Sequence, residues 1–388
     1  MKKSRITIVF IMATLFCLLM GVNVNAQDIS IESKSAVLID AGTGEVLFEQ
    51  NKDEKLPPAS ITKIMTMLLT MEAIDNGKIT MEDKVTISQY ASEMGGTQLY
   101  IEPGETRTVE ELLTGVAVES ANDAASALGE YVGGTQETFI KLMNDRAKEL
   151  GMLNTQFKNA NGLPAEGHYT TAYDVALMSK ELVKHEKIHQ YLTMWMVDVT
   201  VGKNNDRVRT LANTNKLLKS YDGLDGIKTG YTTEAKHCLS ATAKKGNLRL
   251  ISVILSADSS QIRFNEAAKL LDYGFANFDG VSIAEKGEEI QEIKIEKGIL
   301  EKTKAVTENS LSVLMKKGED SQIEKKVMLD ASYKAPIEKG QKLGELIAYL
   351  GDKEMGKVNL IASETIEESS FIYMYKKIII DWLRPVKE

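Results

Sequence analysis

The chain has 388 residues, with 47 Lys and Arg against 55 Asp and Glu, which gives a formal net charge of −8 at pH 7. This length suggests two or more domains. The acidic balance, with no basic patch interleaved with aromatic residues, argues against a general nucleic-acid binder, so we expect no nucleic-acid partner.

The first residues are typical of a secretory signal peptide. A basic start, KKSR, precedes an apolar run that ends at about Met20, and the small residue Ala26 stands at a cleavage position. We expect residues 1–26 to be removed on export, because the run is short for a membrane span of ~20 residues. The mature chain then keeps Cys238 as its one cysteine, so no intramolecular disulfide is possible.

Residues 36–69 predict two strands followed by a helix. The stretch AVLIDAGTGEVLFE alternates around a Gly-Thr-Gly turn, as a strand pair does. After PPAS, apolar side chains recur at helical spacing and predict one buried stripe, formed by Ile61, Ile64, Met65, Leu68 and Leu69. Ser60 and Lys63 lie off that stripe, one turn apart on a shared face.

Further helices are predicted over residues 108–129, 134–150 and 172–192. Residues 237–256 predict two adjacent strands with a Lys-Gly turn, and residues 262–277 predict a last helix that ends near Gly274.

The composition changes at about Asp279. Residues 281–362 are rich in Lys and Glu and carry short apolar alternations: IQEIKI, SLSVLM, KKVML, GELIAYL and KVNLIA. They predict a small all-β domain over residues 279–365. It has no Gly-rich phosphate loop and no clustered ligands, so we assign it no chemistry.

The last residues, 366–388, predict an amphipathic helix. Its large apolar side chains fall on one face: Phe371, Met374, Tyr375, Ile378, Ile379, Trp382 and Leu383. The stretch is too short and too charged to span a bilayer, and it suits a helix that lies in the membrane interface. The alternative is a helix docked on the protein's own surface.

Three short motifs carry the chemistry. Ser60-Ile61-Thr62-Lys63 is followed 60 residues later by Ser120-Ala121-Asn122, and Lys228-Thr229-Gly230 comes 108 residues after that. Ser-x-x-Lys alone arises easily by chance. In this order and at these separations, the three motifs are the signature of penicillin-binding proteins and serine β-lactamases.

Physical chemistry explains why these residue types are needed. A serine hydroxyl is a poor nucleophile and needs a base. To act as that base, Lys63 must lose a proton held with a reference pKa of ~10.4, and a shift of ~3 units costs on the order of 4 kcal/mol. Burial beside a second cation, for which Lys228 is the natural candidate, can supply such a shift. Ser120 can relay a proton, Asn122 can hold a substrate amide, and Thr229 can donate to a carboxylate.

The chain resembles the D-alanyl-D-alanine carboxypeptidases, low-molecular-mass penicillin-binding proteins of the serine peptidase class. The resemblance covers nearly everything after the signal, including DAGTGEVLFEQN, ESANDAASAL, LGMLNTQFKNANGL and DGLDGIKTGYTTEA. It implies an α+β catalytic domain over residues 27–278, with an antiparallel sheet and a helical subdomain, then the β domain and the anchoring helix. It also implies a part in peptidoglycan biosynthesis and cell shape.

The resemblance implies roles for individual residues. Ser60 is then the acyl-enzyme nucleophile, Lys63 its base and Ser120 a proton relay, with Lys228 among the substrate-binding residues. The further substrate-binding residues are Asn122, Thr229, Gly230, Tyr231 and Arg263. Backbone N–H groups of Ser60 and Tyr231 form the oxyanion hole, and Arg263 is a partner for the terminal carboxylate. The expected partners are a stem peptide ending in D-Ala-D-Ala, β-lactams as covalent inhibitors and the outer face of the cytoplasmic membrane. No metal or other cofactor is expected.

One position departs from the family pattern. The family usually has Ala-Gly where this chain has Ala235-Lys236, and a lysine there can alter the bend after the Lys-Thr-Gly strand. Cys238 lies in the same region and is expected to be a small buried strand residue.

Three other functions were weighed. His185-Glu186-Lys187-Ile188-His189 matches the His-Glu-x-x-His pattern of zinc peptidases, but its surroundings are charged and no third ligand is evident. A class A β-lactamase needs a glutamate where Leu150 stands. A non-catalytic wall-binding module remains open, although the three intact motifs argue against it.

Overall fold

The computed structural model describes residues 29–318 and 322–371, together with Tyr375 and Ile379. The elements below all lie within residues 33–388, one of the two units into which the chain divides. The predicted signal peptide, residues 1–26, and most of the predicted tail helix, residues 366–388, lie outside the described residues.

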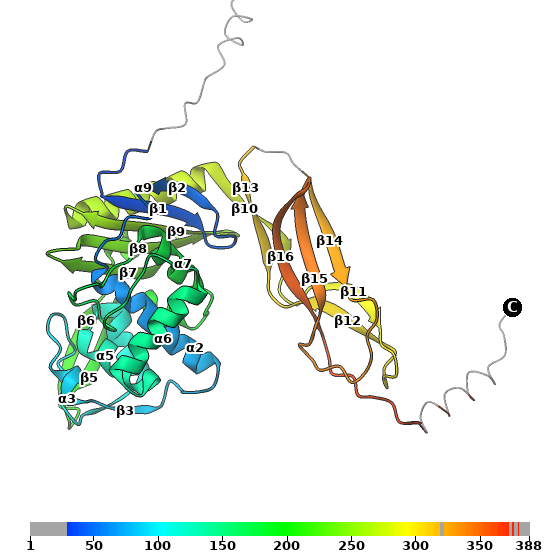
Figure 1. The fold of residues 1–388 in the computed structure, drawn as a ribbon, viewed down its shortest axis with the longest axis horizontal. Coiled ribbons are helices and arrows are strands. Elements are labelled where there is room, and N and C mark those ends of the chain that lie inside the picture. The colour runs from blue at the N-terminus through cyan, green and yellow to red at the C-terminus, as the bar shows by residue number, and fades with distance from the viewer. Residues whose placement is uncertain (1–28, 319–321, 372–374, 376–378, 380–388) are drawn as a thin grey trace, which may run out of the picture. The chain divides into compact units, whose positions relative to one another are not determined.

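A five-stranded antiparallel sheet forms the centre of the first described part of the chain (Figure 1). Its order is β2-β1-β9-β8-β7, with bounds β1 Ser35–Asp40, β2 Val46–Gln50, β7 Leu224–Thr232, β8 Lys236–Lys245 and β9 Leu248–Ala257. Helix α9 (Ser260–Asn277) packs on one face, and α7 (Ala172–Leu182) packs on the other. The central strands are therefore buried on both faces, and all six residues of β1 are buried. The two predicted strand pairs are confirmed.

The remaining elements lie between β2 and β7 in the chain. They are η1 (Ala59–Thr62), α2 (Lys63–Asp75), β3 (Lys84–Thr86), α3 (Gln89–Ser92), β4 (Thr106–Thr108), α4 (Val109–Thr114), η2 (Gly115–Glu119), α5 (Asn122–Gly133), α6 (Gln136–Glu149), α8 (Ile188–Leu192), β5 (Met196–Val201), β6 (Arg207–Ala212) and η3 (Lys216–Lys219). Helix α2 packs against α5, α6 and α7, so it is buried all round and its polar Lys63, Thr66 and Thr70 are buried as well. All five residues of the predicted stripe are buried, so that prediction is confirmed, and neighbouring elements cover further faces of the helix as well.

Two predicted helices are interrupted. The helix predicted over residues 172–192 is α7 and α8, because the His189 side chain lies 3.0 Å from the Val183 carbonyl and can take the place of the next helical N–H. The helix predicted over residues 108–129 begins with a capping box of Thr108 and Glu111 and breaks at Ser120. The last helix runs to Asn277, three residues past the predicted end at Gly274.

The second described part is all-β, as predicted. A five-stranded sheet has the order β11-β12-β16-β15-β14, and β10 pairs with β13 in a separate two-stranded sheet. The bounds are β10 Phe278–Ala284, β11 Glu289–Lys294, β12 Lys302–Thr307, β13 Leu311–Lys316, β14 Ile323–Leu329, β15 Lys342–Leu350 and β16 Lys353–Ala362. Its core extends to Ile366, which pairs with Ile337, and the Ser369 N–H donates to the Lys297 carbonyl. The contacts of the β domain therefore continue beyond Thr365, the residue at which sequence reasoning placed the end of that domain.

Candidate active site

Ser60 and Lys63 meet where the short helix η1 passes into α2. Lys63 is completely buried, and its Nζ lies 3.0 Å from Ser60 Oγ, 2.6 Å from Asn122 Oδ1 and 2.5 Å from the Asn161 carbonyl. Burial, and then the nearby charge of Lys228, hold the pKa of Lys63 well below the ordinary lysine range.

This set of contacts suits a neutral amine. A neutral amine keeps two N–H donors and gains a lone pair. The two donors match Asn122 Oδ1 and the Asn161 carbonyl, both of which can only accept. The lone pair is then left for the Ser60 hydroxyl proton, so the geometry can carry a proton from Ser60 Oγ to Lys63 Nζ.

Ser120 stands at a break between two helices. It ends the π-helical turn η2 with φ of 71° and ψ of 33°, a left-handed conformation that serine adopts rarely. Its buried Oγ has no hydrogen-bond partner among the described residues. Asn122, which begins α5, is fixed at both ends of its amide, because its Nδ2 donates to the Gly95 carbonyl while its Oδ1 accepts from Lys63.

Lys228 and Thr229 lie on the edge strand β7. Lys228 is buried, and burial and then Arg263 lower its pKa to about 7. Its Nζ donates to the Thr229 carbonyl at 3.1 Å, and Thr229 Oγ1 donates to Thr214 Oγ1 at 2.7 Å. The strand thus carries an amine and a hydroxyl on adjacent residues, and a protonated amine with a hydroxyl suits a carboxylate.

Gly230 lets β7 approach η1 closely. A Cβ atom at this position would lie 3.1 Å from both Ala59 Cβ and the Pro58 carbonyl, and 3.2 Å from Ser60 N. A side chain there would crowd the space between the strand and Ser60. Tyr231, the next residue, is exposed, and its ring lies against the His237 ring at 4.6 Å between centroids.

Comparison with known proteins assigns the chain to a family. Residues 22–259 match the family model described as D-alanyl-D-alanine carboxypeptidase, and residues 278–368 match the C-terminal domain of penicillin-binding protein 5. The carboxypeptidase DacF of Bacillus subtilis is 44% identical over 92% of this chain and 92% of its own.

The chain belongs to the D-alanyl-D-alanine carboxypeptidase family.

Solved structures agree with this assignment. Penicillin-binding protein 5 of Haemophilus influenzae is 30% identical with a TM-score of 0.67, and the match covers 88% of this chain and 99% of that one. Penicillin-binding protein D2 of Listeria monocytogenes, solved in an ampicillin-bound form, is 36% identical with a TM-score of 0.57, over 64% of this chain and 99% of that one. The predicted catalytic domain and all-β domain, the family and the serine-carboxypeptidase activity are confirmed, whereas the predicted C-terminal helix is not. Neither the β-lactamase nor the non-catalytic alternative is favoured.

Arg263 lies behind the strands of this carboxypeptidase site. Its Nη1 donates to the Gly230 carbonyl at 2.9 Å and to the Cys238 carbonyl at 3.2 Å, across a facing pair of β7 and β8. The guanidinium therefore ties the two strands together through α9. Cys238 is buried beside it, and burial raises the pKa of its thiol to about 11, which makes it a poor nucleophile.

Lys236 does not disturb the bend after the Lys-Thr-Gly strand. It has a left-handed φ of 54°, and its Nζ lies 2.6 Å from Asp258 Oδ1. Strands β7 and β8 still pair in unbroken register from Gly226↔Thr242 to Thr232↔Lys236. Glycine adopts this backbone conformation freely, so the position suits glycine. The intact strand pairing shows that a lysine is tolerated there.

Sequence reasoning missed several residues of the site. The Asn161 carbonyl contacts Lys63, and Gly162, with φ of 87°, brings its loop so close to η1 that a Cβ would lie 1.8 Å from the Ala59 carbonyl. The Asn161-Gly162 pair is a recognisable turn signal, but nothing in it shows which element the turn contacts. Thr214 likewise has no motif of its own.

The His-Glu-x-x-His pattern does not form a ligand pair. His185 Nδ1 bonds Asp75 at 2.6 Å, while His189 Nε2 bonds the Val183 carbonyl and its Nδ1 lies 3.3 Å from Asp225. Within the part of the chain that the structure describes, no group of three or more His, Cys, Asp or Glu could hold a metal ion.

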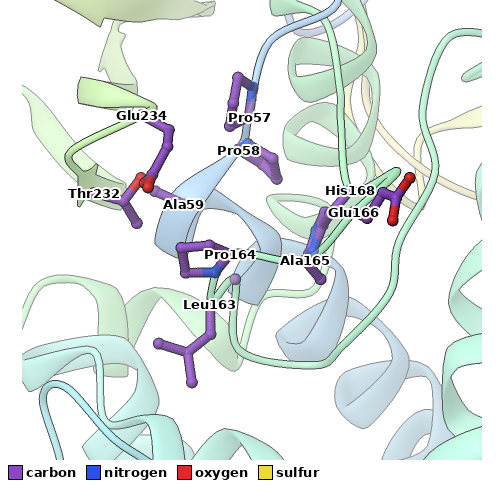
Figure 2. Close-up of a pocket in the computed structure, with 11 residues that line it drawn as sticks. Pro57, Pro58, Ala59, Leu163, Pro164, Ala165, Glu166, His168, Thr232 and Glu234 are labelled. Carbon is purple, nitrogen blue, oxygen red and sulfur yellow. The ribbon is translucent and has the colours of Figure 1, made fainter.

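A cavity of about 310 Å³ opens beside Ser60 (Figure 2). Three segments line it: Pro57–Ala59 before the serine, the loop from Gly162 to His168, and Thr232 with Glu234 after the Lys-Thr-Gly strand. His168 is pinned by a 3.0 Å contact between its Nε2 and Thr62 Oγ1, and burial, then Lys158, lower its pKa to about 4.

Proposed function

We propose that Ser60 is the nucleophile of the D-alanyl-D-alanine carboxypeptidase reaction and that Lys63 is its general base. The observation that carries this proposal is the 3.0 Å contact between Lys63 Nζ and Ser60 Oγ, made by a buried lysine whose pKa is lowered well below its usual range. A lysine of lowered pKa can accept the hydroxyl proton near neutral pH.

The acylation step runs as follows in this proposal. Ser60 Oγ attacks the carbonyl carbon of the penultimate D-alanine while its proton passes to Lys63. The oxyanion that forms is held by the backbone N–H groups of Ser60 and Tyr231. The carbon–nitrogen bond then breaks, and the leaving nitrogen receives the proton from Lys63 through Ser120 Oγ, which has no other partner among the described residues. Free D-alanine leaves, and the peptide stays on Ser60 as an ester.

In deacylation, water takes the part of the attacking group and Ser60 Oγ becomes the leaving group. A water molecule attacks the ester carbonyl carbon and gives its proton to Lys63. The bond from the carbonyl carbon to Ser60 Oγ breaks, and Ser60 recovers the proton. A β-lactam enters by the same attack on its ring carbonyl. The ampicillin-bound form of penicillin-binding protein D2 of Listeria monocytogenes, a similar protein, supports this interpretation of the site.

Other side chains hold the substrate in this proposal. Lys228 and Thr229 bind the terminal carboxylate, and Asn122 holds a substrate amide. Gly230 leaves the space between β7 and Ser60 free of a side chain. Arg263 acts through the strand, since two strand carbonyls already accept from its Nη1. We propose this indirect role in place of the direct contact between Arg263 and the terminal carboxylate that the family resemblance implies.

We also propose that the protein works outside the cytoplasm, on the outer face of the membrane. The signal-like residues 1–26 support export, and the exposed Phe371, Tyr375 and Ile379, four residues apart, support an interfacial tail. No helix among the described residues is long and apolar enough to cross a membrane. In this proposal residues 27–278 are catalytic, the β domain follows from residue 279, and the tail begins after the contacts of Ser369.

Substitution of Ser60 tests the assignment of the nucleophile. We expect Ser60→Ala to lose both D-alanine release from a peptide ending in D-Ala-D-Ala and covalent labelling by a fluorescent penicillin. Ser310→Ala, which removes an exposed hydroxyl in the β domain, is the matched control and should keep both. Persistent labelling of the Ser60→Ala protein would move the nucleophile to another residue.

A further inference from the structure

A second cavity, of about 210 Å³, lies where α7 packs against β1 and β9, and none of its lining residues takes part in the proposed mechanism. Its charged lining residues are Asp40 at the end of β1, Lys180 and Lys184 at and just after the end of α7, and Lys244 and Arg249 in the β8–β9 hairpin. Four cations therefore share this lining with one carboxylate, although the chain as a whole has a net charge of −8.

Two of these cations already have acidic partners. Lys184 Nζ lies 2.6 Å from Glu181 Oε2. Arg249 holds both oxygens of Asp225, since its Nη1 donates to Oδ1 at 2.8 Å and its Nη2 lies 2.7 Å from Oδ2. These two ion pairs are complete without a ligand.

Lys180 has no such partner. Its side chain is half-buried, and its Nζ has no hydrogen bond or ion pair with any described residue. The Nζ lies against the turn after β1, since a Cβ on Gly44 would be 2.9 Å from it. Burial, and then the charge of Lys184, lower the pKa of Lys180, and the carboxylates of Asp40 and Glu181 offset this only in part. A lysine in the last turn of α7 suits the helix dipole, but the dipole gives its ammonium group no hydrogen-bond acceptor.

Lys244 is the second cation without a partner. It lies directly opposite Arg249 in the pairing of β8 with β9, a position at which like charges destabilise a sheet. Its Nζ also has no hydrogen bond or ion pair with a described residue. Asp40, the one acid of the lining, is engaged within its own turn, where its Oδ2 accepts from the N–H and hydroxyl groups of Thr43. The cavity thus brings together two ammonium groups, from different elements, that no described residue pairs.

We propose that this cavity binds a phosphate group that carries two negative charges, either as free phosphate or as the end of a larger molecule. The two ammonium groups of Lys180 and Lys244 match the two charges. Phosphate oxygens point in tetrahedral directions, so they can accept from donors on α7 and on β8 at once, whereas a carboxylate offers two oxygens in one plane. Lysine is a common phosphate ligand. The volume lies below the range of about 300–1,000 Å³ for drug-sized ligands, which suits a small group.

Calorimetric titration of the full-length protein tests the site. It is done near pH 7, where a phosphate monoester with a second pKa of about 6 is mostly doubly charged. Inorganic phosphate and glycerol 1-phosphate are titrated at constant ionic strength, with dimethyl phosphate as the singly charged comparison. At least one of the doubly charged ligands should bind roughly tenfold more tightly than dimethyl phosphate, the scale of one hydrogen bond to a charged group. Tighter binding of inorganic phosphate assigns the site to free phosphate, and tighter binding of glycerol 1-phosphate assigns it to the end of a larger molecule.

Exchange of single lysines locates the site. Lys180→Met keeps an unbranched side chain and removes the ammonium group, so it should weaken binding of the tighter ligand by roughly tenfold. In phosphate-free buffer the same variant should unfold at no lower temperature than the wild type, because Lys180 has no described partner to lose. Lys244→Met should also weaken binding. Lys52→Met removes another half-buried lysine, one paired with Glu49 and outside the cavity, and should leave binding unchanged.

Three results would overturn the inference. The first is the absence of saturable binding by both doubly charged ligands, and the second is binding of dimethyl phosphate as tight as theirs. The third is binding that survives both Lys180→Met and Lys244→Met. D-alanine release checks that each variant is folded, because neither lysine belongs to the proposed mechanism and both variants should keep this activity.

Discussion

In the proposed mechanism, Lys63 can act as the base because of where its three neighbours lie. Two of them, Asn122 Oδ1 and the Asn161 carbonyl, only accept hydrogen bonds, so they hold the amine without competing for its lone pair. The helix around it is buried on all sides, which excludes the water that would stabilise the ammonium form. The base and its serine are therefore positioned before any substrate arrives.

Exchange of Lys63 for arginine separates basicity from charge. Arginine keeps the positive charge but does not deprotonate in proteins. We expect Lys63→Arg to slow acylation by labelled penicillin by roughly a thousandfold, within the range for loss of a general base. Lys148→Arg, on the exposed face of α6, is the control and should label normally. Acylation of Lys63→Arg near the wild-type rate would mean that Lys63 acts only through its charge.

The two buried lysines should be coupled in their pH dependence. The acylation rate should rise with pH as Lys63 loses its proton, because only the neutral amine can act as a base. The charge of Lys228 is the second cause of the lowered pKa of Lys63, so its removal should raise that pKa. We therefore expect Lys228→Met to move the midpoint of the acylation profile to higher pH. The check is a stopped-flow titration with benzylpenicillin, and a midpoint that stays or moves down would contradict the coupling.

At the scale of elements, the site depends on the close approach of three segments. The loop at Asn161-Gly162 and strand β7 both lie against η1, which holds Ser60. Glycine at positions 162 and 230 permits the contacts, because a Cβ at either place would meet backbone atoms of Pro58 or Ala59. Small displacements of these elements would move Ser60 relative to its base and to the oxyanion site.

Gly162→Ala should therefore damage catalysis more than folding. The new Cβ would lie 1.8 Å from the Ala59 carbonyl, so the loop or η1 must shift. We expect acylation to slow by at least about a hundredfold, the loss typical of a misplacement of about 1 Å. The check is acylation kinetics together with thermal unfolding.

Gly167→Ala is the matched control for that substitution. It lies in the same loop with a similar φ of 75°, but its Cβ would first meet the flexible Lys158 side chain at 3.1 Å. Both variants carry the same left-handed strain, and only Gly162→Ala adds the backbone clash. Equal effects of the two would assign the loss to strain and not to displacement of Ser60.

At the scale of the whole molecule, the tail bears on the proposed location of the enzyme at the membrane. Phe371, Tyr375 and Ile379 are exposed and recur every four residues, so they share a helical face. The β domain contacts the chain as far as Ser369, whose N–H group donates to the Lys297 carbonyl. A chain ending at Ser370 therefore keeps the β-domain contacts and loses the apolar face.

We expect this shortened chain to be recovered free of membranes and to release D-alanine from a short peptide at the full rate. The full-length chain should bind vesicles that contain anionic lipid, and Phe371→Asp with Tyr375→Asp should weaken that binding. Leu153→Asp removes another highly exposed apolar side chain and serves as the control. Vesicle flotation measures the difference, and unchanged flotation of the double variant would argue for a tail packed on the protein itself.

Sequence reasoning predicted the features that have a recognisable motif or periodicity. It missed the features that depend on contacts between residues distant in the chain. The three motifs and the strand alternations identified the chemistry, the sheet and the β domain. The Asn161 carbonyl could not be predicted, because every residue has one and only packing selects it. The break between α7 and α8 coincides with a contact between the His189 side chain and the Val183 carbonyl, and the left-handed turn at Ser120 overrides helical propensity on both sides. The buried stripe of α2 was predicted, but the burial of its polar Lys63, Thr66 and Thr70 was not, because it depends on elements that come later in the chain.

The order of strands in the catalytic sheet has a consequence for synthesis. Ala36 in β1 pairs with Ile254 in β9, which follows 218 residues later (254 − 36 = 218). Ser60 and Lys63 are therefore synthesised early. Lys228 and Tyr231, which share strand β7, are synthesised much later. Contacts so distant in the chain slow folding. In the proposed mechanism, a nascent or prematurely terminated chain that lacks β7 to β9 has Ser60 but neither Lys228 nor the N–H group of Tyr231, so a β-lactam should acylate Ser60 only after these strands have been synthesised.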